Sequence, residues 1–228
     1  MMRRVLIVLM TFFLETSIDA SAQPPVKDAW LWGTLSLDKK IYKRFTVVFD
    51  EELRMFDNWS RVNLLFSNLS LEYKLSKKFR FAVAYRFINK DQDEYYSQRH
   101  RLYVDASYRT KWNDFLFVYR LRLQGQVRNL YSSQKGGYVE SYMRHKFDLQ
   151  YNRKKFTPYL AAEFRFQFTS PFYPEGNDQW DRGRYYAGCD YDFDKDNSIN
   201  LYFMIQHDYN IPFYQEDYVT GIQYTHHF

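Results

Sequence analysis

The stretch FTPYLAAEFRFQF, residues 156–168, constrains the fold more than any other part of the chain. Alternate side chains of a β-strand point to opposite faces of the sheet, so the stretch predicts two unlike faces. The apolar face carries Phe156, Pro158, Leu160, Ala162, Phe164, Phe166 and Phe168, and the polar face Thr157, Tyr159, Ala161, Glu163, Arg165 and Gln167. A strand of this length is about twice as long as a usual strand. It is long enough to cross a bilayer, for which about 9–11 residues suffice.

The same alternation recurs along the chain and indicates further strands. We assign strands to residues 30–37, 45–56, 62–75, 79–89, 99–110, 115–127, 139–151, 156–168, 184–193, 198–209 and 218–228. Short charged turns at 76–78, 111–114, 152–155 and 194–197 alternate with longer polar segments at 90–98, 128–138, 169–182 and 210–217. Short turns on one side and long loops on the other are typical of outer-membrane barrels. We therefore predict a transmembrane antiparallel β-barrel with short periplasmic turns and longer extracellular loops; a soluble β fold is the alternative.

The number of strands follows less directly from the pattern. Eleven segments alternate, whereas single-chain bacterial barrels have even numbers of strands. Either the segment 30–37 is not a full barrel strand, which gives ten strands, or two strands have been merged, which gives twelve. We expect about 10–12 strands and favour twelve.

The composition fits strands with two unlike faces. Aromatic residues make up 21% of the chain, yet its mean hydropathy is −0.61 and 26% of its residues are charged. The net charge of +5 is scattered along the sequence, so we do not expect nucleic-acid binding. The single cysteine, Cys189, excludes an internal disulfide.

The two ends of the chain carry export and assembly signals. Residues 1–22 combine a basic start, an apolar run at 5–14 and the sequence Ala20-Ser21-Ala22, which predicts a signal peptide. Residues 23–228 then form the barrel, and export places it in the outer membrane among its lipids. The last segment ends on Phe228 with aromatic residues in phase, similar to the signal read by the bacterial barrel-assembly machinery.

Several strand-and-turn motifs resemble a known family. They are WLWGTLSLDKKIYKRFTVVFDEELRMFD, SRVN, LEYKLSKKFRFAVAYRF, RHRLYVD, PYLAAEFRF and RGRYYAGCDY. These stretches look like the small outer-membrane barrels of domain of unknown function 2490, and the likeness covers nearly the whole chain after residue 22. The resemblance implies a Gram-negative outer-membrane protein and no particular activity.

The polar faces gather charged residues that we expect to line the lumen. They are Asp50, Glu52, Arg80, Arg86, Arg99, Arg101, Asp105, Arg109, Arg120, Arg122, Glu140, Arg144, Asp148, Glu163 and Arg165, with Lys146, Asp190 and Asp208 on the same phase. A narrow barrel fills its interior with side chains, and buried charges there need partners. One interpretation is a closed plug of arginine–carboxylate pairs. The other is a narrow channel or binding barrel for a small polar or anionic solute, because arginine suits carboxylates and phosphates.

A lipid hydrolase or deacylase is the enzymatic alternative. Ser141 and His145 share the outward phase of one strand, and His207 is a further candidate. Four residues along a strand separate Cα atoms by about 13 Å, so neither could activate the other directly. A serine nucleophile needs its base within hydrogen-bond reach, and no spacing provides this. The sequence favours a non-enzymatic role, and predicts neither a metal site nor a cofactor.

Overall fold

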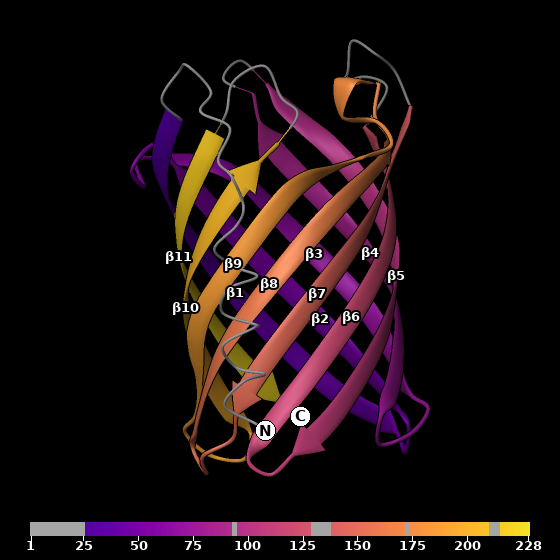
Figure 1. Cartoon of the computed structure of the whole chain (residues 1–228), viewed down its shortest axis with the longest axis vertical. Helices are drawn as coiled ribbons and strands as arrows, with labels where there is room; N and C mark the ends of the chain where they lie inside the picture. Colours follow the sequence, from indigo (N-terminus) through magenta and orange to yellow (C-terminus); the bar gives the residue numbers. More distant parts are fainter. Residues whose placement is uncertain (1–25, 93–94, 129–137, 172–173, 210–214) are drawn as a thin grey trace, which may run out of the picture.

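The computed structural model describes residues 26–92, 95–128, 138–171, 174–209 and 215–228. These residues form one closed barrel of mainly antiparallel strands with a single short 3₁₀ helix (Figure 1). The elements are β1 (Val26–Tyr42), β2 (Phe45–Phe56), β3 (Arg61–Lys74), β4 (Phe79–Asp91), β5 (Tyr96–Trp112), β6 (Phe115–Arg128), β7 (Val139–Tyr151), β8 (Phe156–Thr169), η2 (Pro174–Gly176), β9 (Gln179–Asp192), β10 (Asn197–Asp208) and β11 (Gln215–His227). Within the described residues, no helix has the length and apolar character needed to cross a membrane.

The barrel wall follows from the two-residue alternation. On β8, Leu160 is 63% exposed on the outside, whereas Glu163 and Gln167 are 2% and 1% exposed on the inside. The same contrast holds on β5, where Leu102 is 62% exposed and Tyr103 is 6% exposed. Large apolar side chains therefore cover the outer surface and polar side chains fill the lumen, the reverse of a water-soluble protein. The predicted transmembrane β-barrel fold is confirmed.

The barrel closes through a parallel pair of strands. All other neighbours are antiparallel, but β1 pairs parallel with β11, from Val26 opposite Gln215 to Asp38 opposite His227. An odd number of strands running alternately up and down leaves the first and last pointing the same way, so only a parallel pair can close them. The described residues thus give eleven strands, within the expected range of 10–12. The preference for twelve was wrong, because it assumed that closure must be antiparallel.

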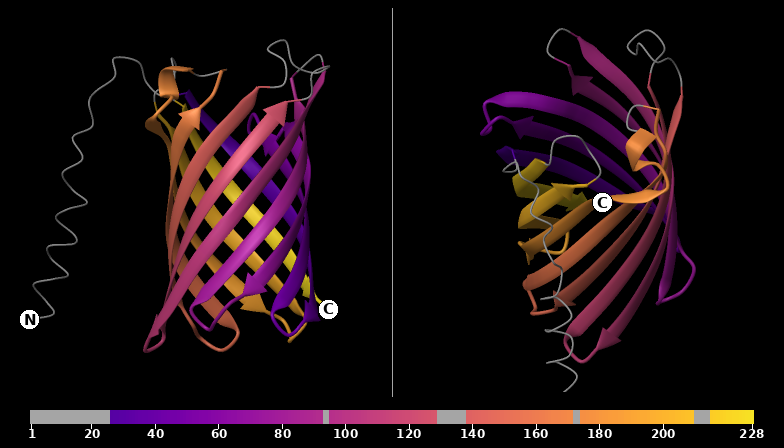
Figure 2. Two further views of the ribbon diagram at one scale, coloured as in Figure 1. Left: turned by 90° about the vertical axis from the view of Figure 1, so that its right-hand side faces the viewer. Right: turned by 45° about the horizontal axis from the view of Figure 1, so that its top comes forward.

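The two ends of the barrel differ in their connections. Tight turns join β1 to β2, β3 to β4, β5 to β6, β7 to β8 and β9 to β10 at one end, which we call the turn end. The other end, the loop end, holds η2 and the longer connections (Figure 2). Parts of these connections, at 93–94, 129–137, 172–173 and 210–214, lie outside the described residues. The predicted signal peptide, residues 1–22, also lies outside them.

A ring of aromatic pairs marks the turn end. At four successive hairpins, the phenylalanine that begins one strand contacts a tyrosine on the next hairpin's descending strand. The pairs are Phe45–Tyr73, Phe79–Tyr108, Phe115–Tyr151 and Phe156–Tyr191, with ring centroids 4.7–5.1 Å apart. Aromatic girdles of this kind occur where a barrel leaves the hydrocarbon of a bilayer.

Candidate functional site: a cationic chamber in the lumen

A layer of stacked arginines and aromatic rings crosses the lumen about halfway along the barrel. The guanidinium of Arg54 lies 3.5 Å from the ring centroid of Trp32, that of Arg86 3.7 Å from Phe66, and that of Arg122 3.7 Å from Tyr103. Longer contacts link these pairs to one another: Arg184 to Trp32 at 5.3 Å, Arg54 to Phe66 at 5.5 Å, and Arg86 to Tyr103 at 5.8 Å. Guanidinium groups over ring faces are attracted by the ring quadrupole. We call this the mid-lumen layer.

Ion pairs complete the mid-lumen layer on the other side of the barrel. Glu163, which is 2% exposed, accepts hydrogen bonds from Arg120 at 2.9 Å, from Arg184 at 3.4 Å and from Arg144. On the adjoining strands, Arg122 donates two bonds of 2.7 Å to the carboxylate of Asp105. The buried carboxylate is thus fully paired, and each of the three arginines has a carboxylate partner, which a buried charge requires.

Three apolar side chains fill the layer beside the β1–β11 seam. Trp32, Met204 and Val219 are 5%, 0% and 0% exposed and pack together, with Trp30 and Tyr202 against them. Trp30 and Trp32 line a cavity on one side of this layer and Tyr202 lines a cavity on the other side, and the two cavities have no lining residue in common.

The larger cavity, which we call the loop-end chamber, has a volume of about 570 Å³. Ligand pockets commonly measure about 300–1,000 Å³. Its charged lining is Arg54, Lys90, Arg99, Arg101, Arg128, Arg165, Arg182, Arg184, Glu140, Asp181, Asp208 and Asp217. The described lining holds eight cations and four carboxylates. Two of the cations, Arg54 and Arg184, are also paired with Glu52 and Glu163, which lie outside this lining.

The two walls of the loop-end chamber differ in how these charges are compensated. On β8, β9 and β10, Arg165 donates to Asp181 at 2.9 and 2.5 Å, and Arg182 donates to Asp208 through both Nε and a terminal nitrogen. These forked pairs match one cation to one carboxylate. Because Arg165 and Arg182 are each paired with a carboxylate, this wall attracts an incoming anion only weakly.

The opposite wall, on β4, β5 and β6, carries the excess positive charge. Lys90, Arg99, Arg101 and Arg128 line it, and Glu140 of β7 is the carboxylate beside them. Glu140 accepts bonds from Arg128 at 2.9 Å and from the amide of Gln126 at 2.5 Å. The described hydrogen bonds of Arg101 go to Oε1 of Gln126, at 3.0 and 2.6 Å, rather than to a carboxylate. We call these four cations the basic wall.

Three neutral polar groups in the chamber also lack hydrogen-bond partners among the described residues. They are the indole N–H groups of Trp30 and Trp32 and the Oε1 atom of Gln124. Trp32 and Gln124 are 5% and 6% exposed. A buried polar group without a partner is costly, so these atoms are available to a bound molecule.

The smaller cavity, the turn-end chamber, has a volume of about 300 Å³. Its charged lining is Lys146, Asp148 and Asp190, and the rest consists mainly of tyrosine, amide and hydroxyl side chains. Tyr159 donates to Asn200 at 3.1 Å, and Asn200 donates to Asp190 at 2.5 Å. With one cation and two carboxylates, this chamber has no excess of positive charge.

The structure places the residues predicted to line the lumen in three groups. The mid-lumen layer contains Arg86, Asp105, Arg120, Arg122, Arg144 and Glu163. Asp50 and Glu52 lie beside it. The carboxylate of Asp50 accepts a hydrogen bond from Ser36 at 2.7 Å, and Glu52 pairs with Arg54 at 2.5 Å. Arg99, Arg101, Glu140 and Arg165 line the loop-end chamber. Asp148 lines the turn-end chamber, and Arg80 and Arg109 lie near the turn end on β4 and β5, Arg80 being 3.8 Å from Glu72.

Several chamber residues escaped the sequence analysis. Lys90, Arg128 and Arg182 fell in segments assigned to loops, although the structure has them in β4, β6 and β9. Extending the two-residue phase would have found them, since Lys90 continues the series of Arg86 and Arg128 that of Arg122. β4, β6 and β9 are longer than the minimum needed to span a bilayer, and the sequence analysis assigned these extra strand residues to loops.

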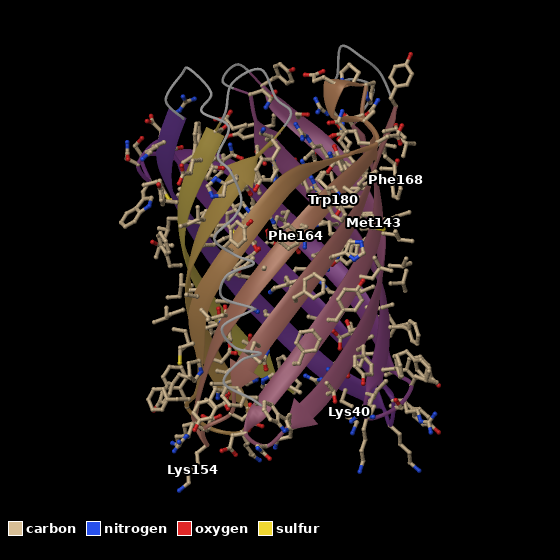
Figure 3. The ribbon with its side chains drawn as sticks, in the orientation of Figure 1. Lys40, Met143, Lys154, Phe164, Phe168 and Trp180 are labelled. Atoms are coloured by element: carbon tan, nitrogen blue, oxygen red, sulfur yellow. The ribbon has the colours of Figure 1, made fainter. Side chains whose placement is uncertain are left out.

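The residues considered for lipid hydrolysis lie on the outer wall. His145 Nδ1 lies 2.7 Å from the hydroxyl of Tyr119, and within the described residues no serine bonds its ring. His207 contacts the rings of Tyr185 and Tyr209. Met143, Phe164, Phe168 and Trp180 surround this region of the outer surface (Figure 3). Ser141 opposes Gly125 and Thr169 across the sheet, so the structure does not bring it to His145.

Within the described residues, no group of three or more histidine, cysteine or acidic side chains could hold a metal ion.

The fold defines the chain as a transmembrane β-barrel protein. Residues 30–216 match the family of proteins of unknown function called DUF2490, and the chain belongs to this family. No curated protein matches it.

Two solved barrel structures are similar to the chain. The NanC porin is 12% identical with a TM-score of 0.50, over 78% of this chain and 86% of that one. The translocator domain of the autotransporter NalP from Neisseria meningitidis is 10% identical with a TM-score of 0.37, over 73% of this chain and 70% of that one. The likeness to the porin concerns the fold alone.

Proposed function

We propose that the protein is an outer-membrane barrel that binds small anionic solutes in its loop-end chamber. The observation that carries the proposal is the basic wall, where the four cations Lys90, Arg99, Arg101 and Arg128 line the chamber together. The lining carboxylate beside them, Glu140, accepts a bond from Arg128. Forked guanidinium donors suit carboxylate and phosphate groups. The unpartnered indole N–H groups and the Oε1 atom of Gln124 would bind the polar, uncharged part of the same solute.

The proposal includes a location and an orientation. A signal peptide at residues 1–22 would export the chain, and the C-terminal strand ending in Phe228 would be recognised by the barrel-assembly machinery. The turn end would then face the periplasm and the loop end the exterior. In this orientation the basic wall meets solutes that arrive from outside the cell.

The chamber is proposed as a binding site rather than an open pore because the mid-lumen layer separates the two cavities. A purely structural barrel is the second candidate, and the same closed layer favours it. Citrate binding distinguishes the two, since a structural barrel does not require an anion site beside the basic wall. Nothing in the arrangement around Ser141, His145 and His207 favours lipid hydrolysis.

The proposal is tested by titrating the detergent-refolded protein with citrate and following tryptophan fluorescence, because Trp30 and Trp32 line the chamber. We expect saturable binding of citrate and none of choline at the same ionic strength. Arg101→Gln removes one forked donor and should weaken citrate binding about tenfold, since a charged hydrogen bond contributes about 1.5–3 kcal/mol. In planar bilayers the wild-type barrel should show no steady conductance.

The matched control is Lys146→Gln, which removes one cation from the turn-end chamber. Its citrate affinity should stay within about twofold of the wild-type value, because charges beyond a Debye length of about 8 Å act weakly on one another. If citrate causes no saturable change, or if both substitutions weaken it equally, the chamber is not the anion site.

A further inference from the structure

Four of the five tight hairpins at the turn end carry far more cationic than acidic side chains. Segments 39–45, 74–79, 111–115 and 152–156 contain one carboxylate, Asp114. They contain eleven cationic side chains, all exposed: Lys39, Lys40, Lys43, Arg44, Lys74, Lys77, Lys78, Lys111, Arg153, Lys154 and Lys155. Because β1 to β8 are consecutive neighbours in the wall, these four hairpins adjoin. We call the surface they form the basic arc.

The fifth hairpin reverses this charge and bounds the basic arc. Segment 192–197 has three carboxylates, Asp192, Asp194 and Asp196, against the single cation Lys195. Asp194 is engaged within the turn itself, where it accepts bonds from the side chain of Asn197 at 2.9 and 3.0 Å. The positive charge therefore covers one continuous sector of the turn end rather than the whole rim.

The aromatic pairs fix the level of the basic arc relative to a bilayer. Phe45, Phe79, Phe115 and Phe156 begin the strands that follow these hairpins, and each contacts a tyrosine of the next hairpin. Aromatic residues of this kind sit at the level of the lipid headgroups. The cations lie within a few residues of the rings, and Lys40 and Lys154 project outward from this end (Figure 3). Long lysine stems let the ammonium group reach neighbouring phosphates.

We propose that the basic arc binds the anionic headgroups of phospholipids in the leaflet that meets the turn end. Each hairpin is short, so its cations stay at headgroup level instead of extending into the water as a surface for a protein would. Clusters of lysine and arginine beside a membrane attract anionic lipids. The acidic fifth hairpin leaves the sector at β9 and β10 without such lipids. This inference does not depend on the loop-end chamber.

The test is native mass spectrometry of the protein released from mixed micelles with equal amounts of phosphatidylglycerol and phosphatidylcholine. We expect phosphatidylglycerol to be retained in preference. The double variant Lys77→Gln/Lys78→Gln should lower that preference on the order of tenfold, because each interfacial cation contributes about 1 kcal/mol. The matched control, Lys27→Gln/Lys195→Gln, removes two exposed cations outside the arc and should retain lipids as the wild type does.

Two outcomes would overturn the inference. One is equal retention of the two lipids by the wild-type protein, and the other is an equal loss of preference in the two double variants. Binding of polyglutamate that displaces phosphatidylglycerol from the arc would assign the surface to an acidic protein instead. Citrate titration of the same variants should remain unchanged, so the result is independent of the chamber.

Discussion

The two chambers of the lumen are built by the same alternation of residues but differ in character. The loop-end chamber is large, and its described lining holds twice as many cations as carboxylates. The turn-end chamber is about half as large and carries more carboxylates than cations. There, Tyr159 lies opposite Gly188 and Tyr202 opposite Gly221 across the sheet. A ring beside a glycine can lie against the wall and fill space, whereas the arginines of the loop end leave a cavity.

This difference shows that a barrel lumen can hold a packed region and a binding region in series. In the packed region, the interactions are matched pairs and close contacts, so substitutions there should change stability. In the loop-end chamber, clustered cations repel one another and attract an anionic ligand. Substitutions there should change binding instead.

The largest effect is expected from Glu163→Gln, which would disturb the layer that separates the chambers. Glutamine has nearly the same volume but leaves Arg120, Arg144 and Arg184 without their shared carboxylate. Breaking a buried ion pair in this way costs about 3–5 kcal/mol. Urea unfolding in detergent micelles, followed by tryptophan fluorescence, would measure the change in the free energy of unfolding.

The control for Glu163 is Glu175→Gln in η2, a carboxylate exposed at the loop end. Its free energy of unfolding should match that of the wild type. A loss below about 1 kcal/mol for Glu163→Gln would mean that the mid-lumen layer is held by the aromatic stacks, not by this carboxylate.

An intermediate effect is expected from Gly221→Ala in β11. A Cβ atom at Gly221 would collide with the ring of Tyr202, whereas a Cβ atom at Gly33 in β1 meets no atom within 4 Å. Overpacking of this kind costs about 1–3 kcal/mol, and the Tyr202 ring would be pushed from the wall into the turn-end chamber. Equal free energies of unfolding for Gly221→Ala and Gly33→Ala would show that this chamber is not closely packed.

The smallest effect is expected from Tyr159→Phe in the turn-end chamber. It removes one neutral hydrogen bond, from the tyrosine hydroxyl to Asn200, and the ring still covers Gly188. The free energy of unfolding should fall by about 0.5–1.5 kcal/mol, and citrate affinity should not change. A citrate affinity reduced as much as by Arg101→Gln would show that the two chambers act as one site.

Much of this architecture could be predicted from the sequence, because alternation is a local property. Leu160 and Glu163 differ in phase, and the phase alone places one outside and the other in the lumen. Pairing between strands is not local. Nothing in the sequence states that Glu163 is shared by three arginines from β6, β7 and β9, since that depends on the register of four strands. The residues of the basic wall were predicted only in part. Lys90 and Arg128 lie at strand ends, where the sequence does not distinguish a polar loop from polar strand residues that face the lumen.

The preference for twelve strands within the expected range of 10–12 was wrong for a related reason. The segment 30–37 showed the expected alternation, but only its neighbour could reveal that it pairs with β11 rather than with a missing twelfth strand. Two partners about 190 residues apart along the chain, such as Asp38 and His227, leave no local trace of their contact.

The parallel seam also imposes an order on assembly. Every hairpin joins two strands that are neighbours in the sequence, but β1 must wait until the final strand has taken its place in the wall. Until then β1 and the most recent strand are both open edges, able to pair with other chains. Closing such a long loop is slow. The apolar contact of Trp32 with Val219 and Met204 at this seam is thus a late event, and the two chambers take their final shape only once the first strand has met the last.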